Sequence, residues 1–315
     1  MKNFAPLMIH LFNEHKNTLD VVRIKQNSLV FSSLQAYYQP VTSQGFAIKY
    51  VVEGLEKYTL NGNKYPIETG RYLLTNDTYE GSVEIDEGKN VKGICINVSA
   101  ILLAEVVASI QRPDTSFTDN ALGQFFVSSH FLENQYADTQ THLGQLLRQL
   151  TAQVYHSQLK QEDITDELFY TISEKIVEDQ IPVFRQLQAI PSIKPVTKRE
   201  LFKRLQKGRE FMDNYFTLPL SIINIAQEAC MSEYHFFRLF KTVFGISPNQ
   251  YLIQKRLEYG QSMLKQDRYS VSAAAMESGF SDIHTFSKAF KKHFGVAPSY
   301  FTKQPRQDNY NKVVY

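Results

Sequence analysis

The apolar residues in the first third of the chain come in short runs that are rich in Val, Ile, Tyr and Phe. Gly and Asn separate these runs at intervals of about 8 to 12 residues, a spacing typical of an antiparallel sandwich or barrel. Between two of the runs, Asn61-Gly62-Asn63 is a strong hairpin signal. The pattern therefore predicts a mainly β domain, with strands at residues 46–52, 56–60, 71–74 and 91–98.

From about residue 100 the apolar spacing lengthens to three and four residues, which indicates helices. The residues on these apolar faces are Leu122, Phe125, Phe126, Leu143, Leu146, Leu147, Leu150, Val154, Phe169, Ile172, Ile176 and Val177. Such a face is either core or a dimer interface, and the pattern alone leaves both open. Pro191 and Pro195 then mark a boundary. The expected domains are a barrel at 1–120, a helical dimerisation segment and linker at 121–195, a C-terminal domain at 196–306 and a tail at 307–315.

Composition indicates a packed globular protein, because 43% of the 315 residues are hydrophobic and 21% are charged. The longest apolar run, residues 94–110, is interrupted by Asn97, Ser99 and Glu105, so no membrane span is expected. The N-terminus lacks the apolar region and cleavage site of a signal peptide. Two cysteines, Cys95 and Cys230, are too few for a disulfide framework. We therefore expect a cytoplasmic protein.

The charge is divided unevenly along the chain. Residues 1–195 carry 16 Lys+Arg against 22 Asp+Glu, a net charge of −6, whereas residues 196–306 carry 17 against 9, a net charge of +8. A basic domain of this kind attracts a phosphate backbone, although a run of charge is also a common solvated face. The C-terminal third is thus the candidate anion-binding domain.

That third contains an internal repeat. Residues 220–248 read LSIINIAQEACMSEYHFFRLFKTVFGISP, and residues 269–298 read YSVSAAAMESGFSDIHTFSKAFKKHFGVAP. The copies match at an offset of 49 residues in their first halves, as in Glu228 with Glu277, and at 50 in their second, as in Phe240 with Phe290. The repeat predicts a duplicated pair of helices.

Each copy is typical of a helix-turn-helix, in which the second helix enters the DNA major groove. Ser221 and Ser270 are placed to cap the first helix of each pair, and Ser232 and Ser281 the second. Gly245 and Gly295 stand where each second helix needs a left-handed cap. On the second helices, the inward positions are taken by Phe236, Leu239, Phe240, Phe286, Ala289 and Phe290, and basic residues lie outside.

These residues resemble the AraC/XylS family of bacterial transcription regulators. The resemblance rests on IAQEACMSEYHFFRLFKTVFGISPNQYL, RLEYGQSML and AAAMESGFSDIHTFSKAFKKHFGVAPSYF, and it covers about 100 residues from Arg204 to Arg306. It implies an all-α domain of two helix-turn-helix units joined by a long helix, residues 248–265. Two major grooves on one DNA face lie about 34 Å apart, so one chain would read half-sites about 10 bp apart.

The resemblance also implies roles for single residues. The base-reading positions fall on Glu233, Tyr234, Phe237, Arg238, Asp282, Ile283, His284, Thr285 and Lys288. The phosphate-binding positions fall on Ser232, Lys241, Ser281, Lys291 and Lys292. Phe237 alternatively belongs to the core. Where the family has Gly in the first turn, this chain has Cys230, for which a left-handed conformation costs about 1 kcal/mol, so a differently shaped turn is expected.

The β segment is similar to the cupin-like sensor barrel that often precedes this DNA-binding unit, on the strength of YVVEGLEKYTLNGNKYPIETGRYLLTN. Such a barrel holds a small ligand, or in other proteins a catalytic metal. No histidine lies between residues 16 and 129, so a cupin metal site is not expected. Candidate ligand residues are Tyr37, Phe46, Tyr50, Tyr58 and Arg71, although each aromatic is equally a candidate for the barrel core.

The sequence therefore predicts a regulator, in particular an activator, whose barrel senses a small molecule or other signal. Its expected partners are double-stranded promoter DNA, RNA polymerase, an effector and a second copy of the chain. Two alternatives remain: a DNA-binding regulator whose barrel only dimerises or docks a protein, and a cupin-type enzyme. The enzyme is disfavoured because the chain lacks histidines in the barrel and a nucleophile–base pair at motif spacing. No catalytic residue, metal or cofactor is expected.

Overall fold

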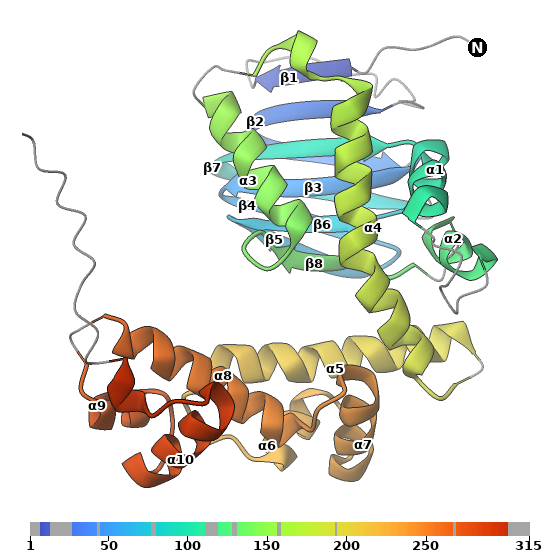
Figure 1. Ribbon diagram of the computed structural model, residues 1–315. Helices are drawn as coiled ribbons and strands as arrows, with labels where there is room; N and C mark the ends of the chain where they lie inside the picture. Colours follow the sequence, from blue (N-terminus) through green and yellow to red (C-terminus); the bar gives the residue numbers. More distant parts are fainter. Residues whose placement is uncertain are drawn as a thin grey trace, which may run out of the picture. The chain divides into compact units, whose positions relative to one another are not determined.

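A computed structural model describes residues 7–12, 27–42, 45–76, 80–110, 119–127, 131–155, 159–192, 194–266 and 269–301. The chain divides into two compact units, Met1–Arg185 and Gln186–Tyr315. The first combines strands with covering helices, and the second is helical (Figure 1). The two units are described separately below.

Eight strands form the sheet of the N-terminal unit in the part of the chain that the structure describes. Their order is β1-β2-β7-β3-β6-β8, and β4 pairs with both β5 and β7. All pairs are antiparallel except β1 with β2, which is parallel. The strands are β1 (Leu7–Phe12), β2 (Ser28–Thr42), β3 (Phe46–Glu53), β4 (Leu55–Leu60), β5 (Asn63–Glu68), β6 (Arg71–Thr75), β7 (Glu80–Val98) and β8 (Asn134–Ala137).

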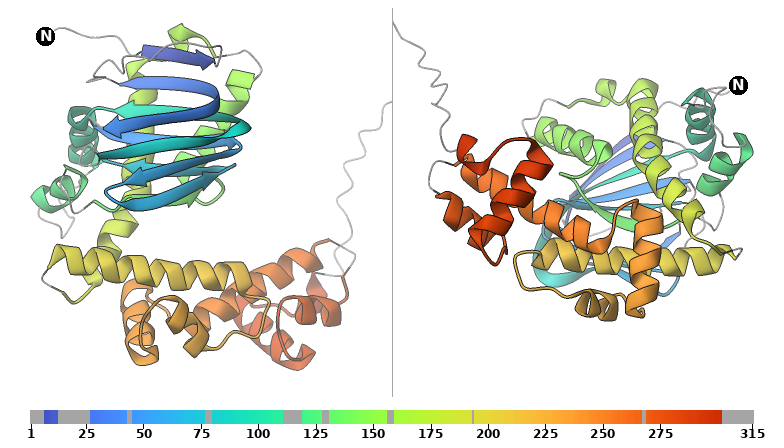
Figure 2. Two further views of the ribbon diagram at one scale, coloured as in Figure 1. Left: turned by 180° about the vertical axis from the view of Figure 1, so that it is seen from behind. Right: turned by 60° about the horizontal axis from the view of Figure 1, so that its bottom comes forward.

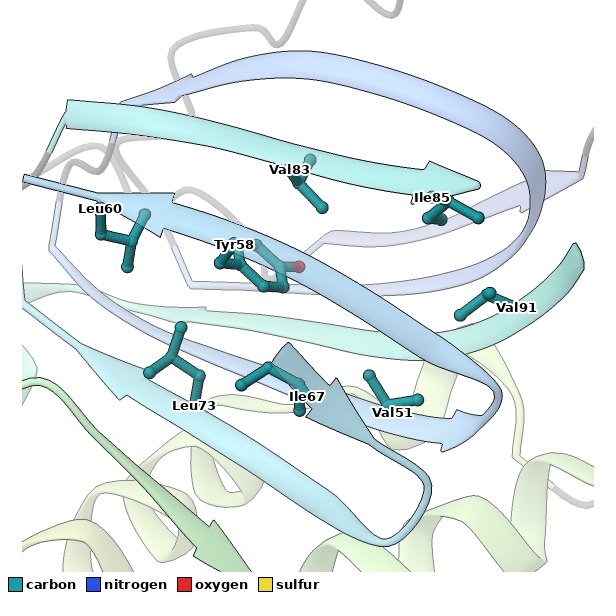
Figure 3. Packing of buried hydrophobic residues seen from close by; sticks show 8 residues of the cluster. All are labelled: Val51, Tyr58, Leu60, Ile67, Leu73, Val83, Ile85 and Val91. Atoms are coloured by element: carbon teal, nitrogen blue, oxygen red, sulfur yellow. The ribbon is translucent and has the colours of Figure 1, made fainter. Parts of the chain in front are cut away.

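The long strands β2 and β7 belong to two layers of a nearly closed barrel. Their pairing shifts between Gln35 and Tyr37, where Ala36 has a left-handed φ of 49°. Beyond this bulge, β2 pairs with the first half of β7, and β4 pairs with the other edge of that half. The second half of β7 pairs with β3. Bulges of this kind bend a strand sharply. The two layers enclose an apolar core, shown in Figure 3: Val51, Tyr58, Leu60, Ile67, Leu73, Val83, Ile85 and Val91.

Helices cover the other face of one layer. Figure 1 shows α3 and α4 lying across this face and α1 and α2 beside it, while the view from behind in Figure 2 shows strands with no helix drawn over them among the described residues. Phe46 of β3 packs against Phe126 and Phe131, and Phe125 packs against Phe184. The helices are α1 (Ala100–Ile110), α2 (Asp119–Val127), α3 (His142–Tyr155), the 3-10 turn η1 (Gln161–Asp163) and α4 (Asp166–Ala189).

The C-terminal unit consists of six α-helices and a 3-10 turn within its described residues. They are α5 (Pro195–Tyr215), α6 (Ile222–Glu228), α7 (Glu233–Phe244), α8 (Pro248–Leu264), α9 (Val271–Glu277), α10 (Ile283–Phe294) and η2 (Pro298–Tyr300). Two successive sets of three helices, α5–α6–α7 and α8–α9–α10, repeat the same order of long, short and medium lengths. In Figures 1 and 2, α7 and α10 lie at opposite ends of this unit and on the same side of it.

The predicted fold class, a cupin-like barrel with following helices and an all-α pair of helix-turn-helix units, is confirmed. The four predicted strands all occur, and 91–98 forms the second half of β7. Strands β1, β2, β5 and β8 were not among the predicted ranges, and β8 pairs with β6 from within the stretch that was expected to be helical. Its four residues are too few for a periodic signal. No described helix has the length and apolar character needed to cross a membrane.

Candidate nucleic-acid interface

The first helix-turn-helix unit consists of α6 and α7. Ser221 caps α6: its side chain accepts a hydrogen bond from the backbone N–H of Asn224, whose side chain bonds back to the Ser221 backbone. The turn after α6 contains Cys230, which adopts a left-handed φ of 52°. The Met231 N–H donates to the Ala226 carbonyl at 2.9 Å, so the turn closes as a helix C-terminal motif despite the strained residue.

The second unit, α9 and α10, repeats this construction. Ser270 caps α9 through the Ala273 N–H. Gly279 stands in the turn with a φ of 86°, and the Phe280 N–H donates to the Ala275 carbonyl at 3.0 Å. Gly245 and Gly295 end α7 and α10 in the left-handed conformation, each with its N–H donating to the carbonyl four residues before. The predicted caps at Ser221, Ser270, Gly245 and Gly295 are therefore confirmed.

The starts of α7 and α10 differ from the prediction and from each other. Ser232 is the N-cap residue of α7 but makes no side-chain cap hydrogen bond. In the second unit the cap is Asp282 rather than Ser281: its carboxylate accepts bonds from the Thr285 N–H at 2.8 Å and the Thr285 hydroxyl at 2.8 Å. These hydrogen bonds lower the pKa of Asp282. Sequence favoured Ser281 by its match to Ser232, although Asp is an equally good cap one residue later.

A buried aromatic face orients each second helix. Phe236, Phe240, Phe286 and Phe290 are fully buried. A glycine on a preceding long helix makes room for each first ring, since a Cβ on Gly208 would lie 2.6 Å from the Phe236 ring and one on Gly260 would lie 2.8 Å from the Phe286 ring. The two helices are thus fixed by equivalent contacts, and their opposite faces point to solvent.

The residues predicted to read bases lie mainly on those solvent faces. Tyr234 is 75% exposed, and Phe237 and Ile283 are both 37% exposed, so Phe237 is not a core residue. Asp282 is half-buried, with both carboxylate oxygens engaged in the cap described above. The other predicted base-reading residues, Glu233, Arg238, His284, Thr285 and Lys288, are exposed, as are the predicted phosphate-binding residues Ser232, Lys241, Ser281, Lys291 and Lys292.

The candidate ligand residues of the barrel do not gather in one place. Phe46 and Tyr50 lie on the face of β3 that carries the helices, where the Tyr50 hydroxyl donates to the Asp138 carboxylate at 2.7 Å. Burial, together with this carboxylate, raises the pKa of Tyr50. Tyr58 lies in the barrel core and Tyr37 packs against it. Arg71 is half-buried and begins β6.

Polar side chains that the sequence analysis missed lie among the interior positions of the barrel. Lys49 lies two residues before the inward-facing Val51 and therefore on the same face of β3. Its ammonium group is 2.7 Å from the Cys95 sulfur. Glu56 is 6% exposed and accepts a hydrogen bond from the Tyr58 hydroxyl at 2.6 Å. Burial raises the pKa of Glu56. Strand alternation places Lys49 on the same face as Val51, but the sequence does not show that this face is the interior of the barrel.

No group of three or more His, Cys, Asp or Glu side chains that could hold a metal ion occurs in the described parts of the chain.

The chain matches two family models, one described as an AraC-like ligand binding domain over residues 33–172 and one as a helix-turn-helix domain over residues 225–304. The second match contains both α7 and α10.

Among curated relatives, the chain is 34% identical over 97 residues to the virulence regulon transcriptional activator VirF of Yersinia enterocolitica, covering 31% of this chain and 35% of that protein. It is 30% identical over 132 residues to the HTH-type transcriptional regulator ArgR of Pseudomonas aeruginosa, covering 42% and 40%. The alignments thus span between a third and two-fifths of these two relatives. Among solved structures, the DNA-binding domain of AdpA in complex with a target DNA matches 31% of this chain and 88% of that chain, with 26% identity and a TM-score of 0.30.

Proposed function

We propose that this chain is a transcription regulator of the AraC/XylS family, which binds promoter DNA in a sequence-specific manner and controls transcription from it. The observation that carries the proposal is the pair of equivalent helix-turn-helix units in one compact unit, with the outer faces of α7 and α10 exposed. Two helix-turn-helix units, each with an exposed second helix, fit two successive major grooves on one DNA face.

The exposed residues divide into base-reading and phosphate-binding groups. Arg238 and Lys288 are suited to guanine through its O6 and N7 atoms, and Tyr234 and Ile283 to thymine methyl groups. Glu233, Phe237, His284 and Thr285 complete the base-reading set. Asp282 acts by ordering the first turn of α10. Lys241, Lys291 and Lys292, with the hydroxyls of Ser232 and Ser281, hold phosphates.

Selection of random duplex DNA by the full-length chain, read out at two salt concentrations, tests the proposal. We expect an enriched motif of two short elements about one helical turn apart. If six to eight phosphates are neutralised, log K falls with log salt at a slope of about −5 to −7. Enrichment of no sequence, or a slope near zero, would contradict DNA binding by these residues.

The barrel is proposed to sense a small molecule. Its interior combines an apolar core with the polar groups of Lys49, Glu56 and Cys95, and such a combination suits recognition of a polar ligand. A thermal shift assay on a metabolite panel tests this, because a ligand at 100 times its Kd adds about 2.7 kcal/mol to stability. If no compound of the panel raises the Tm, the alternative is favoured, in which the barrel binds no small molecule and only dimerises or docks a protein.

The remaining proposals concern assembly and location. We assign dimerisation to residues 121–195, activation to contact with RNA polymerase, and the protein to the cytoplasm, where promoter DNA is read. Sedimentation of the full-length chain over a range of concentrations tests the dimer. A monomer at all concentrations, including with operator DNA present, would contradict it.

A further inference from the structure

The two helix-turn-helix units meet at one arginine of the long helix α8. The Arg256 Nε atom donates to the Phe216 carbonyl at 2.6 Å, and its Nη2 atom donates to the Leu218 carbonyl at 2.7 Å. Both carbonyls belong to the segment between α5 and α6, directly before the first helix-turn-helix unit. A single guanidinium thus donates two hydrogen bonds, in a fixed fork, to the backbone that leads into that unit.

The turn of the second helix-turn-helix unit packs against the place where Arg256 meets the segment between α5 and α6, a contact region called the junction below. Gly279, between α9 and α10, has a φ of 86° and lies so close that a Cβ there would be 2.7 Å from the Thr217 carbonyl and 3.0 Å from Arg256 Nε. The Phe216 ring also packs edge-on against Tyr259 of α8, with centroids 5.3 Å apart. Arg256 therefore lies where the loop of the first unit, α8 and the turn of the second unit come together.

The position of this junction along α8 matters mechanically. At its start, α8 is tied to α7 by the three residues Gly245, Ile246 and Ser247. A helix held at one end pivots there, and 17 residues span roughly 25 Å, so a tilt of about 10° would move the far end by roughly 4 Å. This exceeds the 3.4 Å rise of one base pair. A second attachment at the middle of α8, where Arg256 is the ninth of the 17 residues, restricts that tilt.

The geometry points to Arg256 as the positioning residue that sets the distance between α7 and α10, and so the spacing of the two half-sites that the chain accepts. This inference rests on the proposed function, because it concerns how strictly DNA is read. Asp213 of α5 adds to the same attachment, since its carboxylate accepts a hydrogen bond from the Tyr251 hydroxyl at 2.7 Å and pairs with the Lys255 ammonium at 2.9 Å.

The test uses the full-length chain and duplexes that carry the selected motif with its natural spacing or with one base pair added or removed. The variants are Arg256→Ala and Arg256→Lys, which keeps the charge but loses the fork. Arg204→Ala is the matched control: Arg204 lies in α5 and donates to the Cys230 carbonyl at 3.2 Å within the first unit. Thermal melting of each variant accompanies the binding measurements.

We expect the wild-type chain and Arg204→Ala to lose at least about tenfold in affinity when the spacing changes by one base pair. Both Arg256 variants should lose less than about threefold, whatever their affinity for the natural spacing. A purely structural role would lower the Tm and all affinities together and leave the spacing ratio unchanged, which would overturn the inference. A wild-type chain that binds its motif equally well at all three spacings would also overturn it, whereas failure to select any motif would contradict the proposed function instead.

Discussion

Single residues decide how closely the two helix-turn-helix units match. Cys230 and Gly279 occupy equivalent turn positions, and both are left-handed, with φ values of 52° and 86°. Cysteine pays for this conformation with strain that glycine avoids. The sequence marked Cys230 as the unusual residue, but the expectation of a differently shaped turn is wrong, because both turns close with equivalent backbone hydrogen bonds. Cap identity was harder to predict, because adjacent Ser281 and Asp282 are both good caps and only the backbone geometry separates them.

At Glu56 the buried carboxyl makes stability depend on pH. Burial raises the pKa of Glu56 in the folded state, so folding favours the protonated carboxyl. The contribution of Glu56 to the free energy of unfolding is therefore fully present below the ordinary carboxyl pKa, and it is lost as the pH rises through the raised pKa. We expect Glu56→Gln to raise the Tm at neutral pH. The Tm of this variant should also change less with pH between mildly acidic and neutral pH than the Tm of the wild-type chain. Thermal melts across this range measure the effect.

Tyr58→Phe is the matched control for this prediction. It removes the hydroxyl that donates to Glu56, and so withdraws the hydrogen bond that favours the ionised form. The Tm should then fall more steeply with pH than in the wild-type chain. Identical pH profiles for the wild-type chain and Glu56→Gln would show that the carboxyl is not a buried titrating group.

Among the elements, the long helices α5 and α8 act as the platforms on which α7 and α10 are seated. Each platform has a glycine, Gly208 or Gly260, under a phenylalanine ring. This contact was not predictable from the sequence, because a helical glycine without its partner reads only as a weak helix former. The helix pairs themselves were predictable, since their apolar positions and end residues repeat.

Replacing Gly260 with Ala tests the seating of α10. The new Cβ would lie 2.8 Å from the fully buried Phe286 ring, so helix α8 and α10 must move apart. Although Ala favours the helix, overpacking of this kind costs about 1–3 kcal/mol. Chemical denaturation should therefore show a destabilised C-terminal unit. Gly123→Ala in α2, where a Cβ meets nothing within 4 Å, is the control and should be neutral or stabilising; equal effects at both sites would refute the steric argument.

For the whole molecule, the sequence predicted both domain types but resolved them unequally. The C-terminal domain carries a repeat, so every expectation could be checked against its second copy. The barrel offers no such check: alternation shows which residues share a face, but not which face is the interior. For this reason Phe46 and Tyr50 were predicted as ligand residues from their aromatic rings alone. In the structure both lie toward the helices, whereas Lys49 between them belongs to the interior face.

The division of charge between the units gives a prediction for DNA binding by the entire chain. Lys291 and Lys292 are exposed at the end of α10 and are assigned to phosphates. The double variant Lys291→Gln/Lys292→Gln should weaken binding about equally for all sequences and reduce the magnitude of the salt slope by roughly 2. Titrations at several salt concentrations measure this slope.

Arg238→Ala is the comparison. It should relax base preference at one position of the motif and leave preference elsewhere intact. If the double lysine variant altered base preference instead, with an unchanged slope, the two groups of residues would have to exchange roles.

Helix α8 has a consequence for anyone who wishes to redesign the operator. It is the connection between the two units and also the first helix of the second one, because Gly260 seats Phe286 just as Gly208 of α5 seats Phe236. Helix α8 is therefore not a spacer alone. Inserting one residue before Arg256 would turn everything beyond it, α9 and α10 included, by about 100° relative to the first helix-turn-helix unit, and would carry Arg256 away from the Phe216 and Leu218 carbonyls. A longer or shorter operator therefore requires a new contact surface between the two helix-turn-helix units, and a longer helix alone is not enough.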